Sequence, residues 1–171
     1  MAKRLLLILM AGFVVLSLAL PAGCTKRTVF KGGEGSVTVE QKGKKGKVKI
    51  KTGKGEAEIE TGAELPKNWP QDMPVYKSAK ITGSTSIKGE GNAVTLSLVL
   101  ETSDSVVQVQ KFYQTTLPNE GWDITQTSTT ATGEEEAAIF TVAKGKRTGI
   151  ITIGKPADKE KTELVIQIFS Q

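Results

Sequence analysis

The sequence predicts an α+β protein in which an antiparallel β-sheet carries one α-helix packed across a face, preceded by a small three-stranded β-meander. Two observations lead to this class. Short segments in which apolar and polar residues alternate recur between residues 36 and 169, and this is the period of a half-buried strand. One segment, residues 105–117, instead spaces its apolar residues by three and four, as the buried face of a helix does. A single helix among several strands is typical of a helix packed on an antiparallel sheet.

The N-terminus has the features of an export signal. A basic start at residues 3–4 precedes an apolar run from Leu5 to Leu20, and small residues then lead to Cys24. The run is shorter than the roughly 20 residues that a bilayer span needs. The arrangement resembles the lipobox of bacterial lipoproteins, with Pro21 where that pattern favours an aliphatic residue. The resemblance implies a signal peptide over residues 1–23 and acylation of Cys24, as by palmitate. A plain secretory signal or an uncleaved anchor is the alternative.

Composition narrows the chemistry of the mature chain. Cys24 is the only cysteine, and the sequence has no histidine. Once Cys24 carries lipid, no thiol remains for a disulfide, a metal or a nucleophile, and the commonest general base and zinc ligand are missing. We therefore expect no catalytic residue, no metal site and no cofactor. Carboxylate or lysine chemistry stays open.

The segment after Cys24 divides in two. Residues 24–35 are polar and contain glycine, so we expect a flexible tether on the lipid anchor. Residues 36–62 contain three apolar pairs that alternate with polar residues and are separated by glycine-bearing turns, which predicts three antiparallel strands. The apolar face of this meander is too small to be stable alone, so we expect it to pack against other protein. The pairs are Val37 and Val39, Val48 and Ile50, and Ala57 and Ile59.

Charges predict how two strands of the meander pair. If residues 52–55 form the loop, every lysine of one strand faces a glutamate of the next, whereas a shift by one residue would place lysines opposite apolar side chains. The lysines are then compensated locally. A nucleic-acid or lipopolysaccharide site is the less favoured alternative, because no aromatic residue is interleaved with them. The predicted pairs are Lys47 with Glu60, Lys49 with Glu58 and Lys51 with Glu56.

A proline-rich strap is expected over residues 63–78. Three prolines at four-residue intervals disfavour a regular helix and favour an extended, stiff segment. Trp69, Met73 and Tyr76 are expected to pin this strap to the following domain. A proline-rich ligand for a partner protein is the alternative.

Residues 79–171 are expected to form the α+β domain. Ser105 and Gln108 have the spacing of a helix capping box, although Ser103 or Asp104 could cap the helix instead. Pro118–Gly121 should end the helix. Phe112 is expected to fill the space between helix and sheet. The predicted strands span residues 80–87, 93–101, 122–130, 137–144, 148–154 and 163–169.

Short motifs in this part resemble a domain common in uncharacterised exported bacterial proteins and lipoproteins. The likeness covers about residues 65–169 and implies a fold and a location outside the cytoplasm. The residues that carry it are Met73-Pro74-Val75-Tyr76 with Ala79-Lys80, Thr102-Ser103-Asp104-Ser105, Phe112-Tyr113, Leu117 and Gly121-Trp122.

Several groups are candidates for a site, and each has a structural interpretation that we favour. The acidic run at residues 134–136 is typical of a hairpin tip rather than of a cation site. The carboxylates of Glu101 and Asp104 lie near the predicted helix start, where an acidic residue caps and stabilises the helix. Ser103, Ser105 and Lys111 lack the spacing of a serine–lysine nucleophile. Four aromatic residues suit a pocket or a core, and packing is favoured: Trp69, Phe112, Tyr113 and Trp122.

We expect a lipid-anchored cell-envelope protein that acts as a non-catalytic binding or assembly module. Its expected contacts are the membrane, through the anchor at Cys24, and an envelope protein or polymer, but no nucleic acid. Thr25 is not the aspartate that retains lipoproteins in the inner membrane, so the resemblance allows an outer-membrane location facing the periplasm in a Gram-negative host. The alternative is a carboxylate- or lysine-dependent enzyme acting on an envelope polymer. Converging carboxylates with raised pKa values would favour the enzyme.

Overall fold

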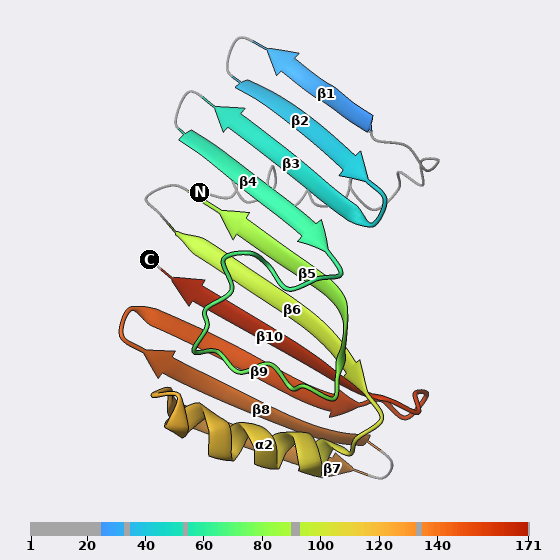
Figure 1. Cartoon of the computed structure of the whole chain (residues 1–171), viewed down its shortest axis with the longest axis vertical. Helices are drawn as coiled ribbons and strands as arrows, with labels where there is room; N and C mark the ends of the chain where they lie inside the picture. The colour runs from blue at the N-terminus through green and yellow to red at the C-terminus, as the bar shows by residue number, and fades with distance from the viewer. Residues whose placement is uncertain (1–24, 33–34, 53–54, 90–92, 133–134, 171) are drawn as a thin grey trace.

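The computed structural model describes residues 25–32, 35–52, 55–89, 93–132 and 135–170, and within them the chain forms one sheet with a single helix (Figure 1). The ten strands are ordered β1-β2-β3-β4-β5-β6-β10-β9-β8-β7, and every neighbouring pair is antiparallel. The elements are β1 (Thr25–Gly32), β2 (Gly35–Lys42), β3 (Lys45–Thr52), β4 (Gly55–Gly62), β5 (Lys80–Lys88), β6 (Val94–Thr102), α2 (Val106–Asn119), β7 (Asp123–Thr132), β8 (Glu135–Lys144), β9 (Arg147–Lys155) and β10 (Thr162–Ser170).

The predicted fold class is wrong. The chain does not form a small meander followed by a sheet with a helix across it, because β4 pairs with β5 and all ten strands belong to one antiparallel sheet. Part of residues 24–35, expected to be a flexible tether, forms β1 and pairs with β2. The helix packs mainly on β7, β8 and β9, so it covers one end of the sheet rather than crossing it. Strand pairing across a long connection leaves no local sequence pattern, and the β4–β5 contact was missed for that reason.

The predicted pairing of β3 with β4 is confirmed. Lys47, Lys49 and Lys51 lie opposite Glu60, Glu58 and Glu56. Residues that lie directly opposite one another on neighbouring strands share a face of the sheet. Glu60 lies opposite Ser86, and Ser86 lies opposite the buried Leu96. The charged side chains therefore lie on the same face as the core. We call this set of six charged residues the charge ladder.

The apolar side chains of the meander are less buried than predicted. Val48, Ile59 and Ile87 form a row on the face opposite the ladder. Val48 and Ile59 are half-buried, Ile87 is exposed, and none belongs to the main core. The expectation that Val48, Ile50 and Ile59 are buried against other protein is therefore not met within the described residues.

The helix starts and ends as the sequence predicts, and its apolar stripe faces the core, but Phe112 is not the residue that is buried deepest. Ser105 and Gln108 form the capping box, and Gly121 adopts a left-handed φ of 77° just beyond the helix. Pro118 lies inside the last turn of the helix. Tyr113 is fully buried, whereas Phe112 is half-buried and stacks edge-on between Tyr76 and Tyr113 with centroid distances of 5.1 and 5.0 Å. Tyr113, not Phe112, fills the space beneath the helix.

The strap, residues 63–78, covers the middle of the ladder-side face. Trp69 and Met73 are buried in the main core, as predicted. The segment is not fully extended, because it turns after Pro66, whose carbonyl accepts a hydrogen bond from the Trp69 N–H at 3.0 Å, and again after Pro70. In Figure 1 the strap passes in front of β6, β10 and β9, and α2 lies in front of the opposite end from β1. Neither the strap nor α2 covers the charge ladder on β3 and β4.

A charged clasp holds the strap to the β8–β9 turn. Arg147 donates two hydrogen bonds to the Asp72 carboxylate, at 2.7 and 2.6 Å, and Lys144 lies 2.6 Å from the same group. The Arg147 guanidinium also lies 5.0 Å from the centre of the Trp122 ring, and the Trp122 indole N–H donates to the Asp72 carbonyl at 2.8 Å. The hydrogen bonds from Arg147 lower the pKa of Asp72 well below its usual range.

Candidate binding groove beside the strap

A groove of about 540 Å³ lies where the strap leaves β4 and crosses the ladder face. Its floor is formed by β2, β3 and β4, and Ser84 and Ser86 of β5 lie at its inner side. The first residues of the strap, Glu64 to Lys67, form its wall. The groove therefore exists because the strap turns back over the sheet directly after β4.

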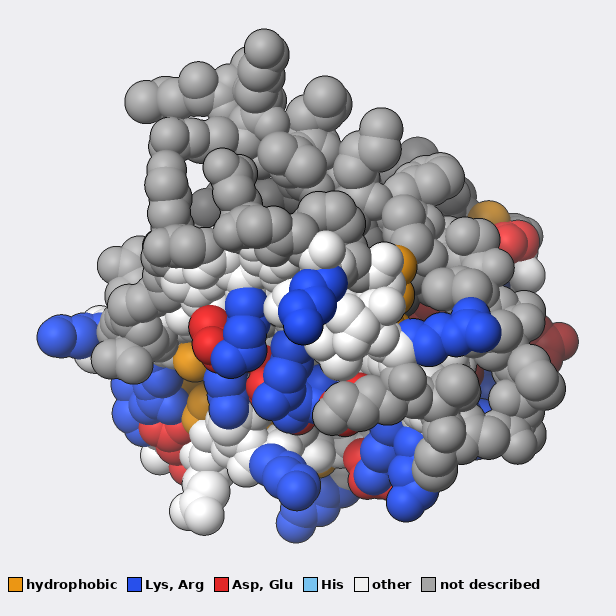
Figure 2. Space-filling view, turned by 90° about the horizontal axis from the view of Figure 1, so that it is seen from above, with side chains coloured by type: hydrophobic (Ala, Val, Ile, Leu, Met, Phe, Trp, Pro, Cys, Tyr) orange, Lys and Arg blue, Asp and Glu red, His pale blue; other side chains and the backbone are white. Residues whose placement is uncertain are grey.

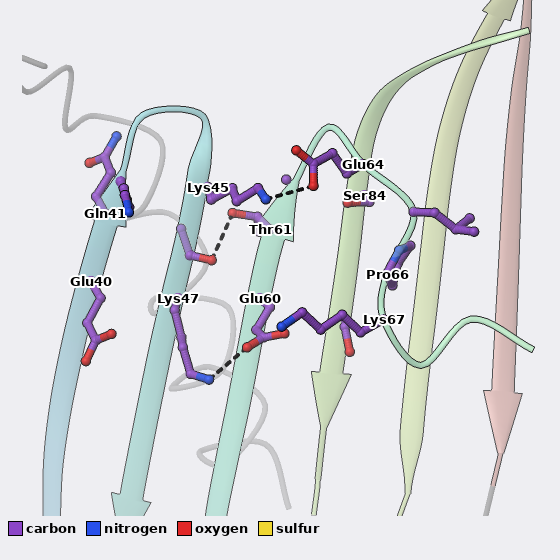
Figure 3. A pocket seen from close by; sticks show the side chains of 15 residues that line it. Glu40, Gln41, Lys45, Lys47, Glu60, Thr61, Glu64, Pro66, Lys67 and Ser84 are labelled. Atoms are coloured by element: carbon purple, nitrogen blue, oxygen red, sulfur yellow. Dashed lines mark hydrogen bonds and ion pairs between the residues drawn. The ribbon is translucent and has the colours of Figure 1, made fainter. Parts of the chain in front are cut away.

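Ion pairs hold the charged side chains of the groove in place (Figure 3). The Lys47 ammonium lies 2.7 Å from both the Glu58 and the Glu60 carboxylates, and Lys45 lies 2.7 Å from Glu64. The hydrogen bond to Glu58 is the main reason why the pKa of Lys47 is raised, and the same contact lowers the pKa of Glu58. Lys67 points from the strap toward Glu60 (Figure 3). Both charge signs are thus presented on one polar surface.

This arrangement suits recognition better than acid–base catalysis. A general acid at neutral pH needs a carboxyl group with a raised pKa. Glu58 and Asp72 have lowered pKa values, because cationic side chains donate hydrogen bonds to them. These carboxylates stay ionised near neutral pH and can accept hydrogen bonds from a cationic or hydroxyl-bearing ligand.

A second, less polar hollow of about 420 Å³ lies along the strap itself. Trp69, Met73, Tyr76 and Ile81 line part of it. The Tyr76 hydroxyl donates to the Asp104 carboxylate at 2.7 Å, which ties the strap to the segment before the helix. Contacts within the chain therefore account for the residues that line this hollow, and no ligand is needed to explain them.

The structure separates most of the candidate site residues that the sequence suggests. Glu101 lies 3.5 Å from Lys161, whereas Asp104 accepts from Tyr76, so the two carboxylates have different partners. Ser105 caps the helix. Trp69, Tyr113 and Trp122 are buried in the core, and Trp69 also lines the hollow along the strap. Among the described residues no group of three or more acidic side chains is arranged to hold a metal ion.

Several predicted features fall outside the described residues, among them the signal peptide over residues 1–23, the acylation site Cys24 and Glu134 of the acidic run. Within the described part of the chain, no helix has the length and apolar character needed to cross a bilayer.

Sequence reasoning found only one side of the groove. Lys47 and Glu60 were predicted to lie together from their alternating charges. Glu64, Lys67, Ser84 and Ser86 were not predicted, because they reach the groove through the path of the strap and the β4–β5 pairing. The one sequence feature that could have indicated these residues was the charge of Glu64 and Lys67 at the start of the strap.

Comparison with known proteins gives one likeness. A family model described as START domain-like matches residues 81–162, slightly less than half of the 171-residue chain. The matched segment runs from β5 through α2 to the first residue of β10. Searches of curated proteins and of solved structures find no significant match.

Proposed function

We propose that this chain is a lipid-anchored cell-envelope protein that acts as a non-catalytic binding module. The observation that carries the proposal is the groove between the strap and the charge ladder, which presents ionised groups of both signs. The START-like match supports binding rather than catalysis. The lipobox-like sequence before Cys24 supports acylation at that residue and, in a Gram-negative host, an outer-membrane location facing the periplasm.

The groove suits a ligand that carries amines and carboxylates together. Ammonium groups from Lys45, Lys47 and Lys67 and carboxylates from Glu60 and Glu64 lie along one surface. Hydroxyl groups from β4 and β5 add neutral hydrogen-bonding partners. A peptide, or an envelope polymer that carries peptides, has this combination of groups. The alternative is a carboxylate- or lysine-dependent enzyme, and a carboxylate acting as general acid would need a raised pKa. Glu58, which contacts Lys47 of the groove, has a lowered pKa instead, and this favours binding.

A photo-crosslinking amino acid in place of Leu65 is expected to capture the ligand. Leu65 lies in the groove wall and is exposed, while Val107 is exposed on α2 away from the groove and serves as the control. In intact cells, the Leu65 position should yield an adduct with an envelope protein or polymer, and Val107 should not. The Lys67→Glu change should reduce the adduct severalfold by reversing a charge of the wall. Equal adducts at both positions, or none at Leu65, would contradict the groove as the contact surface.

The lipid anchor is tested separately by mass spectrometry of the mature N-terminus. The expected product starts at Cys24 and carries acyl chains, as the lipobox-like sequence implies. Such chains would hold the protein on the membrane, because each buried methylene contributes about 0.8 kcal/mol. The Cys24→Ser variant should lose all acyl mass and be retained as a precursor or released from membranes. An unmodified cysteine, or cleavage at another residue, would exclude the anchor.

A further inference from the structure

The topology places the start of the folded chain beside a basic hairpin turn. Thr25, the first residue of β1, pairs with Gln41 near the end of β2, and the next four residues, Lys42–Lys45, form the turn to β3. Cys24 is joined directly to Thr25, and consecutive Cα atoms are about 3.8 Å apart. A lipid on Cys24 would therefore be attached at this end of the sheet with no intervening spacer.

The lysines of this turn are not explained by folding. Lys42 and Lys45 lie directly opposite one another, and like charges in that position destabilise a strand pair. Lys42 and Lys44 are exposed and form no ion pair with a described residue. Lys45 pairs with Glu64, but the two side chains are 60% and 71% exposed, so solvent and salt weaken the pair.

The neighbouring lysines behave differently. On β3, Lys47, Lys49 and Lys51 each contact a glutamate of β4. Figure 2, which looks onto the β1 side of the molecule, shows basic side chains gathered there with acidic ones between them. The positive charge of the turn is therefore less compensated than that of the ladder. Gly43 has a left-handed φ of 59°, and a Cβ at this position would meet no atom within 4 Å, so the tip of the turn is open to solvent.

We propose that the Lys42–Lys45 turn contacts the headgroups of anionic phospholipids and acts as a second membrane signal beside the lipid anchor. The inference rests on the proposed acylation of Cys24 for its biological setting, but its physical basis is the charge of the turn. A lysine near an anionic membrane surface strengthens binding about fivefold. Lys42 and Lys45 also line the groove, so the groove opens beside the headgroups and would meet ligands close to the membrane.

Vesicle flotation of the full chain carrying Cys24→Ser tests the proposal on a protein that has no acyl anchor. The probes are vesicles of phosphatidylcholine alone and of phosphatidylcholine mixed with phosphatidylglycerol, and the readout is the ratio of the two partition coefficients. The apolar N-terminal run is the same in every variant, so it cancels in the comparison between variants. The variant with Lys42, Lys44 and Lys45 changed to Gln should lower the ratio by about tenfold to a hundredfold.

The matched control changes Lys47, Lys49 and Lys51 to Gln, which removes the same number of positive charges. We expect it to lower the ratio by no more than about threefold, because these lysines are paired and lie farther from the anchored end. Equal losses in both variants would overturn the proposal by showing that only net charge matters. No preference of the Cys24→Ser chain for anionic vesicles would also overturn it. Neither result depends on acylation, which the mass of the mature N-terminus decides independently.

Competition with soluble polyphosphate separates a membrane surface from a general anion site. Phospholipid headgroups in a bilayer present many charges in one plane, so polyphosphate at equal phosphate concentration should displace only a minor part of the bound chain. Complete displacement that also depends on the three turn lysines would overturn the phospholipid assignment in favour of a soluble polyanion.

Discussion

Replacing Tyr113 with Ala is expected to lower the free energy of unfolding by about 3–5 kcal/mol. Tyr113 is fully buried beneath α2, between the helix and the β7–β9 end of the sheet, so truncation leaves a cavity that the rigid sheet cannot close. The exposed neighbour Gln114 is the control, and Gln114→Ala should cost well under 1 kcal/mol. Chemical denaturation followed by tryptophan fluorescence measures both. Similar losses at the two positions would show that the buried face of the helix has been misassigned.

The Tyr113→Phe variant separates packing from hydrogen bonding. The backbone of Tyr76 comes near the Tyr113 hydroxyl, but no described group completes a hydrogen bond with it. Burial raises the pKa of Tyr113, so the hydroxyl is neutral and its desolvation is uncompensated. Removing it should leave the free energy of unfolding unchanged or raise it by about 1 kcal/mol. A loss of more than about 1 kcal/mol would instead indicate a hydrogen bond that the hydroxyl makes in solution.

Removing the Asp72 carboxylate is expected to cost about 1.5–3 kcal/mol and to loosen the strap. Asp72→Ala leaves Arg147 and Lys144 close together without the anion that holds them, at side-chain exposures of only 28% and 30%. Trp69 lies in the strap and Trp122 contacts Asp72 of the clasp, so near-ultraviolet circular dichroism should report the change. Limited proteolysis should cut residues 63–78 first. The exposed Asp123→Ala is the control, and equal effects of the two changes would contradict the clasp.

The clasp also predicts acid sensitivity. Hydrogen bonds from Arg147 hold the pKa of Asp72 below its ordinary value of 3.8, so the unfolded state binds the proton more readily than the folded state. The stabilisation is complete above pH 3.8 and is lost as the pH falls below it. Asp72→Asn should therefore show a shallower loss of stability between neutral and acidic pH than the parent chain. An unchanged acid-unfolding profile would rule out this origin.

Local patterns predicted the parts of the fold that depend on neighbouring residues. The alternation of Lys47 to Lys51 with Glu56 to Glu60 predicted the β3–β4 pairing, because a one-residue shift would exchange the two faces. The capping box at Ser105 and the left-handed Gly121 bounded the helix from sequence alone. Trp69 and Met73 pinned the strap as expected. In each case the deciding interaction joins residues close in the chain or follows a fixed strand period.

The predicted helix face shows where a local pattern is ambiguous. Phe112 and Tyr113 both lie on the apolar side of the helix, and adjacent positions differ by about 100° around its axis. Spacing alone admits either residue as the one that faces the sheet. The position of β7 to β9 decides that Tyr113 is buried and that Phe112 packs at the margin against Tyr76.

The sequence alone determined the strand periods, the helix limits, the charge pairing of β3 with β4, and the absence of histidine and of a second cysteine. Only the tertiary structure decided that the meander is continuous with the rest of the sheet, through β4 and β5, and that the strap turns back over the sheet beside the ladder to form the groove. The groove joins Lys47 of β3 to Lys67 of the strap and Ser84 of β5. Such contacts depend on the path of the connection and on which strand edges meet, and neither has a counterpart in the local order of polar and apolar residues.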